Sequence, residues 1–232
     1  IAGKDAVMAA IIRQVGPIDP PAEREPFPAL LRAIVYQQLA GKAAAAILAR
    51  FVALYSKDGA FPNPQSVLKM PDEAMRAAGL SRQKIGYLKD LAAKFADGTL
   101  SDQKLRTLPD QELEAALMSV KGIGRWTADM FLIFTLHRLD VLPVGDLGVR
   151  KAAQRAYAMP EMPQPQALTE FGERWRPYRS VATLYLWRSL DSTDRVPPPA
   201  PAAKQRPSKA QVTRRNAPVA KTKRKNVPKS AP

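Results

Sequence analysis

The sequence predicts an all-α fold, because apolar residues recur at three- and four-residue spacings through residues 1–195 and no sustained two-residue alternation appears. Gly, Pro, Ser or Asp stands at most breaks in this pattern, so we expect short loops between the helices. The chain has 232 residues, which is enough to bury a full core in one domain or in two closely packed ones.

The expected helices follow in order along the chain, at residues 27–39, 42–55, 82–95, 110–120, 126–136, 146–157 and 178–190. Local signals support several of their starts. Pro28 fits the first turn of a helix, where its missing N–H costs nothing, and Ser81 can cap the helix that follows it. Asp110 is expected to cap its helix, ahead of the acidic first-turn residues Glu112 and Glu114.

Composition separates residues 196–232 from the rest of the chain. This segment contains 10 Lys or Arg, no Asp or Glu and 8 Pro, so we expect a disordered tail that cannot bury enough apolar surface to fold. The formal net charge is +15, but residues 1–195 hold only 26 basic against 21 acidic residues, a net charge of about +5. The basic balance favours nucleic acid as partner. The tail is interpreted either as a solubilising or localising extension or as a tether to DNA phosphates.

Residue usage excludes several kinds of site. The chain has no Cys and a single His, His137, which excludes disulfides, thiolate zinc sites and cysteine-ligated iron–sulfur clusters. We expect no metal site and no cofactor, and we interpret His137 as a solvated residue at a helix end. The first residues lack the features of a signal peptide and no segment approaches 18 uninterrupted apolar residues, so we expect a soluble, intracellular protein.

The stretch SVKGIGRWTADM, residues 119–130, places Gly122 and Gly124 between two helical patterns. Glycine tolerates left-handed or crowded backbone angles, so the chain can turn tightly here. The missing Cβ also lets a phosphate approach the N–H groups at the start of the second helix, where the helix dipole favours an anion. The same spacing fits an ordinary cap and turn, and it leaves open whether a monovalent cation supports the hairpin carbonyls.

The segment VKGIGRWTA, followed about 20 residues later by LPVGDLGVRKA, resembles the helix-hairpin-helix base-excision glycosylases. Within them it is most similar to the DNA-3-methyladenine glycosylase II branch, which acts on alkylated bases. The segments PFPALLRAIVYQQLAGKAA, GLSRQKIGYLKDLA and WRPYRSVATLYLWR match further helices of this family. The resemblance therefore covers nearly all of residues 1–195. It implies two packed helical subdomains with a cleft between them, in the compact type without the N-terminal β domain of the larger bacterial relative.

Asp146 is the candidate catalytic residue. Cleavage of an N-glycosidic bond passes through a cation-like sugar, which a fixed carboxylate stabilises while it orients the attacking water. Asp146 precedes a helical run, so we expect it at the helix N-cap, where N–H groups and the dipole favour its ionised form. By itself this position also fits an ordinary capping aspartate, and only the spacing and the family resemblance favour catalysis. Arg150, one turn later, could contact a phosphate or pair with Asp146.

A flipped base needs a pocket, because aromatic contacts must repay part of the lost stacking. We expect Trp126 as its first wall, and the other candidates are Tyr36, Gln37, Met130, Tyr185 and Trp187. Each aromatic residue fits plain core packing as well. In the bifunctional relatives the position of Trp126 holds a lysine that forms a Schiff base with the sugar, and an indole cannot act as this nucleophile. The resemblance therefore implies hydrolysis without lyase activity, with Lys121 as the alternative amine.

The resemblance also implies a wedge that fills the vacated stack. It would lie in the turn at Leu39, Ala40 and Gly41, where Leu39 must do most of the filling because its neighbours are small. The expected DNA contacts are Gln38, Leu39, Ala40, Gly41, Lys42, Lys121, Gly122, Ile123, Gly124, Arg125, Thr127 and Arg150.

Together these observations predict a monomeric DNA glycosylase that hydrolyses alkylated bases, such as 3-methyladenine or 7-methylguanine, from double-stranded DNA. A cationic base of this kind leaves easily and is attracted to aromatic faces. We expect the protein in the cytoplasm, associated with the nucleoid and not with a membrane. Two alternatives stay open. One is a non-enzymatic DNA-binding protein, and the other is the same fold acting on uracil, a mismatched base or an etheno adduct.

Overall fold

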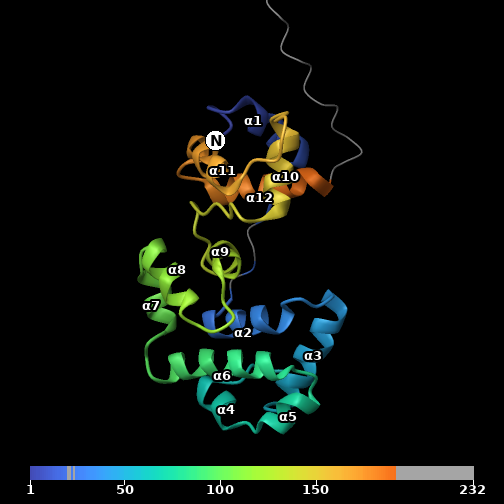
Figure 1. Cartoon of the computed structure of the whole chain (residues 1–232), viewed down its shortest axis with the longest axis vertical. Helices are drawn as coiled ribbons and strands as arrows, with labels where there is room; N and C mark the ends of the chain where they lie inside the picture. Colours follow the sequence, from blue (N-terminus) through green and yellow to red (C-terminus); the bar gives the residue numbers. More distant parts are fainter. Residues whose placement is uncertain (20–21, 23, 192–232) are drawn as a thin grey trace, which may run out of the picture. The chain divides into compact units, whose positions relative to one another are not determined.

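The computed structural model describes residues 1–19, 22 and 24–191, and within them every regular element is a helix (Figure 1). The predicted all-α fold is confirmed, whereas the predicted tail at 196–232 lies outside the described residues. In chain order the elements are α1 (Ala6–Val15), α2 (Pro26–Tyr36), α3 (Gly41–Ala53), α4 (Pro64–Lys69), α5 (Asp72–Ala77), α6 (Arg82–Ala96), α7 (Asp102–Thr107), α8 (Asp110–Met118), α9 (Arg125–Phe134), α10 (Leu147–Ala156), α11 (Pro165–Gly172), the 3₁₀ turn η1 (Glu173–Trp175) and α12 (Arg179–Asp191).

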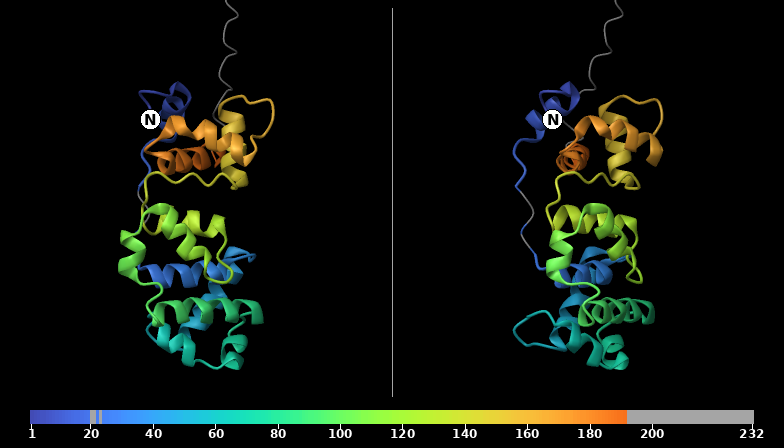
Figure 2. Two further views of the ribbon diagram at one scale, coloured as in Figure 1. Left: turned by 60° about the vertical axis from the view of Figure 1, so that its left-hand side comes forward. Right: turned by 90° about the vertical axis from the view of Figure 1, so that its left-hand side faces the viewer.

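The larger of two hydrophobic cores is built by α2 to α9. The fully buried side chains at its centre include Leu30, Phe51, Leu88 and Leu132. Helix α6 packs against both α2 and α4, and α2 and α6 lie side by side in both views of Figure 2. Helix α6 supports the turn in which α2 ends, because Lys84 on α6 donates to the Val35 and Gln37 carbonyls.

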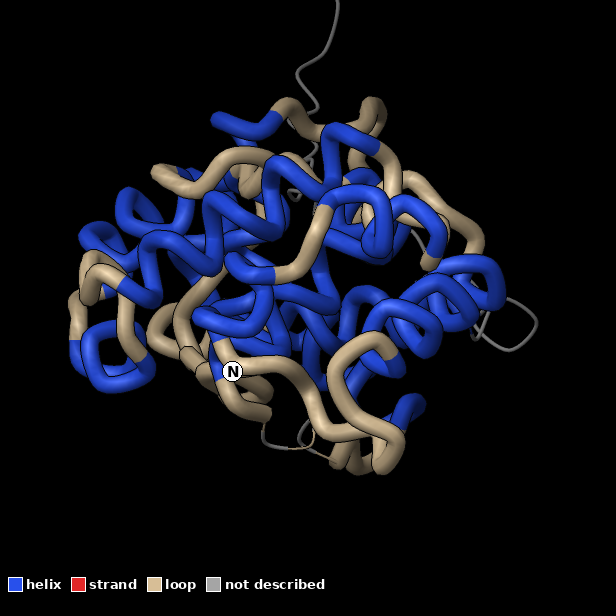
Figure 3. Tube along the Cα trace, turned by 90° about the horizontal axis from the view of Figure 1, so that it is seen from below, coloured by secondary structure: helices blue, strands red, loops and turns tan. Residues whose placement is uncertain are grey.

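The smaller core is built by α1, α10, α11, η1 and α12. Its buried side chains include Met8, Val149, Leu168 and Trp175. Helix α12 contacts both α1 and α10, and loops alone join the helices in the part of the chain that Figure 3 colours. Trp187 on α12 packs against both cores, so α12 connects the smaller core to the larger one.

Several predicted helix ends shift in the structure. The helix expected at 27–39 ends at Tyr36, because Gln37 adopts an extended conformation and Gln38 a left-handed one with φ 56°. Ser81 caps α6 as predicted, since its hydroxyl accepts the Lys84 N–H at 3.2 Å. The predicted cap at the start of α8 is wrong.

Pro109 occupies the N-cap of α8, and Asp110 is the first helical residue. Glu112 lies in the first turn as expected, but Glu114 lies beyond it. Asp110 instead forms an ion pair with Arg138, at 3.4 Å from its Nε. In the sequence LPDQ both Pro109 and Asp110 are compatible with the N-cap position, and in the structure Pro109 occupies it.

The structure also contains helices that the apolar pattern did not predict, namely α1, α4, α5, α7 and α11. Three of these have only six residues, which is too short to display a helical period. Helix α1 has a clear start, because the Asp5 carboxylate accepts the Met8 N–H at 2.9 Å.

Candidate active site

Asp146 stands at the N-cap of α10, as predicted. A tight turn precedes it, in which the Asp146 N–H donates to the Pro143 carbonyl at 2.9 Å. Its carboxylate Oδ1 then accepts the Val149 N–H at 2.8 Å, which satisfies one of the free donors of the first helical turn. The turn and the cap together fix the direction of the carboxylate.

Two indole rings complete the surroundings of this carboxylate. Trp126 Nε1 donates to Oδ2 at 2.7 Å, and Trp187 Nε1 donates to Oδ1 at 2.9 Å. With the backbone N–H, both oxygens of Asp146 meet donors that carry no formal charge. Among the described residues, no cationic side chain forms an ion pair with Asp146.

The two indoles differ in exposure. Trp126 has 53 % of its surface exposed, whereas Trp187 is half-buried and stacks on Phe134 with 5.8 Å between the ring centroids. Gly148 makes the approach of Trp187 possible, since a Cβ at this position would lie 3.1 Å from the indole ring and 3.0 Å from Asp146 Oδ1. The carboxylate is therefore held on its inner side by a fixed ring and on its outer side by a ring open to solvent.

Of the two roles that the sequence left open for Arg150, the structure does not show the pairing with Asp146. The Arg150 guanidinium turns away from the carboxylate and donates to the Pro163 carbonyl at 2.8 Å and to Gln164 Oε1 at 3.3 Å. It thus holds the loop before α11. One helical turn of separation allowed the pair with Asp146, but a backbone carbonyl in the following loop competed for the same donors.

Tyr36 and Met130, two of the predicted pocket residues, line one cavity of about 220 Å³. Phe134 and Thr127 line the same cavity, and Phe134 connects it to Trp187 through their stacked rings. The Arg32 guanidinium lies over the Tyr36 ring, 4.1 Å from its centroid. This cavity is smaller than the roughly 300–1,000 Å³ of sites for drug-sized ligands, and its size suits a single base better than a whole nucleotide.

Tyr185 is not brought to this cavity. Its hydroxyl donates to the Gly16 carbonyl at 3.2 Å, and its ring lines a different cavity together with His137. The expectation of a solvated His137 is also wrong. This residue lies beyond the end of α9 with φ 53°, is half-buried, and has its Nε2 covered without a hydrogen-bond partner among the described residues.

Gln37, another predicted pocket residue, instead holds the hairpin. Its side-chain amide donates to the Gly122 carbonyl at 2.8 Å and lies 3.5 Å from the Thr127 hydroxyl. The turn after α2 is thereby joined to a hairpin about 85 residues further along the chain. The sequence carries no local signal for this contact, because it depends on how α2 and α9 pack.

The glycine hairpin lies between α8 and α9 and is tight, as predicted. Gly122 has φ 84°, and a Cβ here would lie 2.1 Å from the Tyr87 ring, so only glycine fits. Gly124 is the N-cap of α9, and no side chain caps this helix. The side chains of Ile123 and Thr127 are buried, so any contact of the hairpin with an anion falls to backbone N–H groups.

Two further predicted contacts in the hairpin carry charge. Lys121 is exposed, with its Nζ 4.0 Å from Asp90 Oδ1. Arg125 is engaged within the protein, because its Nε lies 3.0 Å from Asp129 Oδ1 and its Nη1 lies 3.2 Å from Glu114 Oε2. Burial raises the pKa of Asp129 to about 6, against the opposing hydrogen bond and charge of Arg125. Burial likewise raises the pKa of Glu114.

The predicted wedge residues form the turn between α2 and α3. Leu39 is an exposed apolar side chain with 39 % of its surface accessible, next to Gln38 in its left-handed conformation. The other members of the predicted turn are exposed as well: Ala40, Gly41 and Lys42. An exposed leucine on a turn that the hairpin holds in place is available for insertion into a groove.

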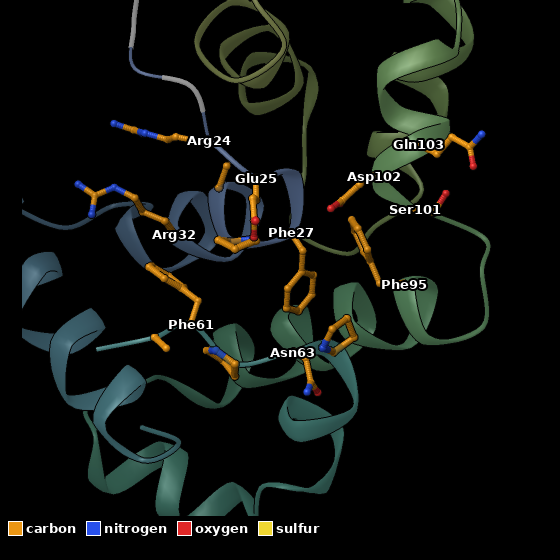
Figure 4. A pocket seen from close by; sticks show the side chains of 15 residues that line it. Arg24, Glu25, Phe27, Arg32, Phe61, Asn63, Phe95, Ser101, Asp102 and Gln103 are labelled. Atoms are coloured by element: carbon orange, nitrogen blue, oxygen red, sulfur yellow. The ribbon is translucent and has the colours of Figure 1, made fainter. Parts of the chain in front are cut away.

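A further cavity lies elsewhere in the described part of the chain. It has a volume of about 1,150 Å³ and is lined by Phe27, Phe61 and Phe95 with polar groups at its rim, including Asp102 (Figure 4). Burial and the nearby charge of Glu25 raise the pKa of Asp102. None of the residues predicted from the sequence to act in catalysis or binding lines this cavity.

Within the described residues, no cluster of His, Cys, Asp and Glu is arranged to hold a metal ion. In the same part of the chain, no helix combines the length and the apolar composition needed to cross a membrane.

Comparison with known proteins gives consistent matches. Residues 31–177 match the HhH-GPD superfamily of base excision DNA repair proteins. The chain is 36 % identical over 205 residues to DNA-3-methyladenine glycosylase 1 of Schizosaccharomyces pombe, covering 87 % of this chain and 90 % of that protein. It is 31 % identical over 166 residues to DNA-3-methyladenine glycosylase 2 of Escherichia coli, covering 68 % of this chain and 55 % of that protein.

Two solved structures are also similar. The S. pombe 3-methyladenine DNA glycosylase in complex with abasic DNA superposes with a TM-score of 0.73 at 36 % identity, covering 84 % of this chain and 97 % of that one. A DNA-3-methyladenine glycosidase from Bacillus halodurans superposes with a TM-score of 0.77 at 36 % identity, covering 83 % of this chain and 88 % of that one.

Proposed function

Because the chain belongs to the HhH-GPD superfamily of base excision DNA repair proteins, we propose that it is a DNA glycosylase that removes alkylated bases from duplex DNA. The relatives named above are DNA-3-methyladenine glycosylases, and one of them is seen in complex with abasic DNA. The substrate class is therefore DNA that carries a base such as 3-methyladenine or 7-methylguanine, and the products are the free base and an abasic site.

One observation carries this proposal. The Asp146 carboxylate is oriented by three N–H donors, from Trp126, Trp187 and Val149, and has no cationic partner among the described residues. A fixed negative charge of this kind stabilises positive charge that develops close to it. One of these donors, Trp126, has an exposed ring, so this carboxylate lies where a bound nucleotide could approach it.

In the proposed reaction the bond between C1′ of the deoxyribose and the base nitrogen breaks, and the base keeps the electron pair. A cationic alkylated base leaves as a neutral molecule. The sugar becomes cation-like, and Asp146 stabilises it and orients a water molecule that adds to C1′ and loses a proton. The stacked Trp187 and Phe134 and the cavity at Tyr36 and Met130 provide apolar and aromatic surface for the flipped base.

DNA would be held by the uncapped N-terminus of α9 and by the turn after α2. The free N–H groups behind Gly124 face a phosphate in the direction that the helix dipole favours. Exposed Leu39 would enter the stack that the flipped base vacates. Lys42 and Lys121 add positive charge near these two segments.

Hydrolysis without lyase activity follows from Trp126. The bifunctional relatives carry a lysine here, and the indole of Trp126 cannot form a Schiff base. The alternative amine, Lys121, is exposed on the hairpin beside Asp90. The product should therefore be an intact strand with an abasic site that is cleaved only after treatment with alkali.

The proposed chemistry needs no cofactor, because the base already carries the positive charge that makes it leave. We also propose that the protein is a monomer and that a monovalent cation can bind at the hairpin carbonyls. We further propose that the protein acts in the cytoplasm at the nucleoid, where chromosomal DNA would supply its substrate. The basic residues 196–232 would then serve as an accessory region, either for localisation or for contact with DNA phosphates.

A glycosylase assay over a panel of duplexes tests the proposed function. The duplexes carry 3-methyladenine, 7-methylguanine, etheno-adenine, hypoxanthine or uracil, and free base and abasic sites are measured separately. We expect release of the alkylated purines by the wild-type protein and none by Asp146→Asn. Salt-sensitive duplex binding without release of any base would instead favour the non-enzymatic alternative.

A further inference from the structure

Helix α6 contacts both of the segments proposed to touch DNA, through residues spaced three apart. Lys84, Tyr87 and Asp90 lie on one face of this helix, because residues three apart on an α-helix are neighbours. Lys84 contacts the turn after α2, whereas Tyr87 and Asp90 contact the hairpin. None of these three residues is needed for the chemistry at Asp146.

The Lys84 side chain acts as a C-terminal cap for α2. Its ammonium Nζ donates to the Val35 carbonyl at 2.6 Å and to the Gln37 carbonyl at 2.7 Å. A cation at the C-terminus of a helix also interacts favourably with the helix dipole. The ammonium is half-buried, and burial lowers the pKa of Lys84. The two carbonyls belong to the last helical turn and to the residue two positions before Leu39.

The hairpin rests on the same face one and two turns further along α6. The Tyr87 ring fills the space that a Cβ of Gly122 would occupy, and Gln83 Nε2 lies 2.6 Å from the Tyr87 hydroxyl. Asp90 Oδ2 accepts the Lys121 N–H at 2.9 Å. Gln37 then closes the arrangement with its hydrogen bond to the Gly122 carbonyl. Each segment is therefore tied to α6 and to the other segment.

From this geometry we infer that Lys84 is a positioning residue, which sets the place of the Leu39 wedge relative to the phosphate-holding hairpin. The inference rests on the proposed function for the identity of the two segments. The wedge and the hairpin must act on the same duplex at once, and a small displacement of one against the other reduces the fraction of encounters in which the base is extruded. A shift of about 1 Å can cost on the order of 100-fold in rate. Loss of the ammonium should therefore affect base release more than it affects duplex binding.

A double-mutant cycle between Lys84→Met and Leu39→Ala tests this inference. Methionine keeps the apolar stem of Lys84 and removes its donors. If Lys84 acts through the wedge, each single variant should lower the single-turnover rate of 3-methyladenine release about tenfold, and the double variant should be little slower than either one. Independent effects, with the double variant about 100-fold slower, would overturn the inference.

Lys89→Met is the matched control. Lys89 lies on the same helix and pairs with Asp72, away from the turn after α2. We expect this variant to release base at the wild-type rate, and its thermal midpoint together with that of Lys84→Met separates positioning from folding. A loss of rate in Lys84→Met that merely follows a lower thermal midpoint, or an equal loss in Lys89→Met, would contradict the inference. If Lys84→Met does not fold, Lys84→Gln takes its place in the cycle.

A second readout does not depend on catalysis. 2-Aminopurine placed next to a tetrahydrofuran abasic analogue in a duplex becomes fluorescent when the wedge unstacks it. We expect Lys84→Met to reduce this fluorescence at saturating protein as Leu39→Ala does, while the affinity for undamaged duplex changes less than twofold. Wild-type fluorescence in Lys84→Met would overturn the inference even if the proposed function holds. An absence of base release by the wild-type protein would overturn the proposed function but leave this test in force.

Discussion

Asp5 and Asp146 have almost the same hydrogen-bond partners and yet stand in opposite surroundings. Each caps a helix by accepting the N–H three residues later, from Met8 at 2.9 Å and from Val149 at 2.8 Å. Each also accepts an indole N–H and one further donor. For Asp5 these are Trp175 at 3.2 Å and the Tyr157 hydroxyl at 2.6 Å, and for Asp146 they are Trp187 and Trp126.

The difference between them is access. Asp5 is 8 % exposed and its indole partner is fully buried, whereas one indole partner of Asp146 is half exposed. Burial acts to raise the pKa of Asp5, but its three hydrogen bonds and the charge of Arg174 outweigh burial and lower this pKa. Three N–H donors likewise orient the carboxylate of Asp146. Only the one that reaches an open surface can also stabilise charge on a bound molecule.

The largest expected effect is the loss of catalysis in Asp146→Asn. An amide has the same shape but carries no negative charge, so we expect base release to fall by about 1,000-fold, while duplex binding persists. Single-turnover release of 3-methyladenine and a binding titration measure the two quantities. Asp5→Asn is the matched control, and it should release base at close to the wild-type rate. Comparable rates for Asp146→Asn and wild type would remove Asp146 from the mechanism.

The next effect distinguishes Trp187, which donates to Asp146, from Trp175, which donates to Asp5. Trp187→Phe keeps an aromatic ring and deletes one donor to Asp146, so we expect the rate of release to fall by roughly 10- to 100-fold. Trp175→Phe deletes the corresponding donor to Asp5 and should change stability instead of rate. Measuring kcat together with urea unfolding for both variants checks the comparison. Equal losses of rate in both would mean that the tryptophans act only through folding.

Asp5→Asn should lower the free energy of unfolding by about 1–2 kcal/mol, because it weakens a helix cap and leaves buried donors imperfectly paired. Because the pKa of Asp5 is lowered in the folded protein, its contribution to stability depends on pH. Its contribution to stability is present above the pKa of the unfolded chain and is lost as the pH falls through the lower folded value. Urea unfolding of wild type and variant at neutral and acidic pH measures both effects. The free energies of unfolding of the two proteins should approach each other at low pH.

The smallest expected effect concerns Asp129, a buried aspartate on α9. Its pKa in the folded protein is about 6, above that of the unfolded chain, so the folded state binds more protons between about pH 4 and 6. Stability should therefore fall as the pH rises through this window, by less than about 1.4 kcal/mol per pH unit. Asp129→Asn should flatten the slope in urea unfolding curves. An unchanged slope would assign the titration to another group, with Glu114 first.

The candidate site was predictable where its signal is local. The position of Asp146 at a helix start follows from LPVGDLGV, and the tight hairpin follows from its two glycines, because caps and turns depend on a few neighbouring residues. Trp126 and Trp187 were predicted as walls of the base pocket, and no local signal indicated that both also donate hydrogen bonds to the Asp146 carboxylate. Tyr185 was predicted to line the base pocket and lines a different cavity, because helical spacing does not state which face meets which partner. Arg150, whose role the sequence left open, bonds to the loop before α11.

The sequence by itself determined the helical fold class and the start of α10, since both depend on periodicity and capping within a few residues of each other. Only the tertiary structure decided that indoles 20 and 41 residues away from Asp146 donate to its two oxygens, and that Lys84 and Gln37 join the turn after α2 to the hairpin. These contacts arise from the packing of helices distant in sequence, where the free energy of burying apolar surface selects the arrangement and no local pattern records it.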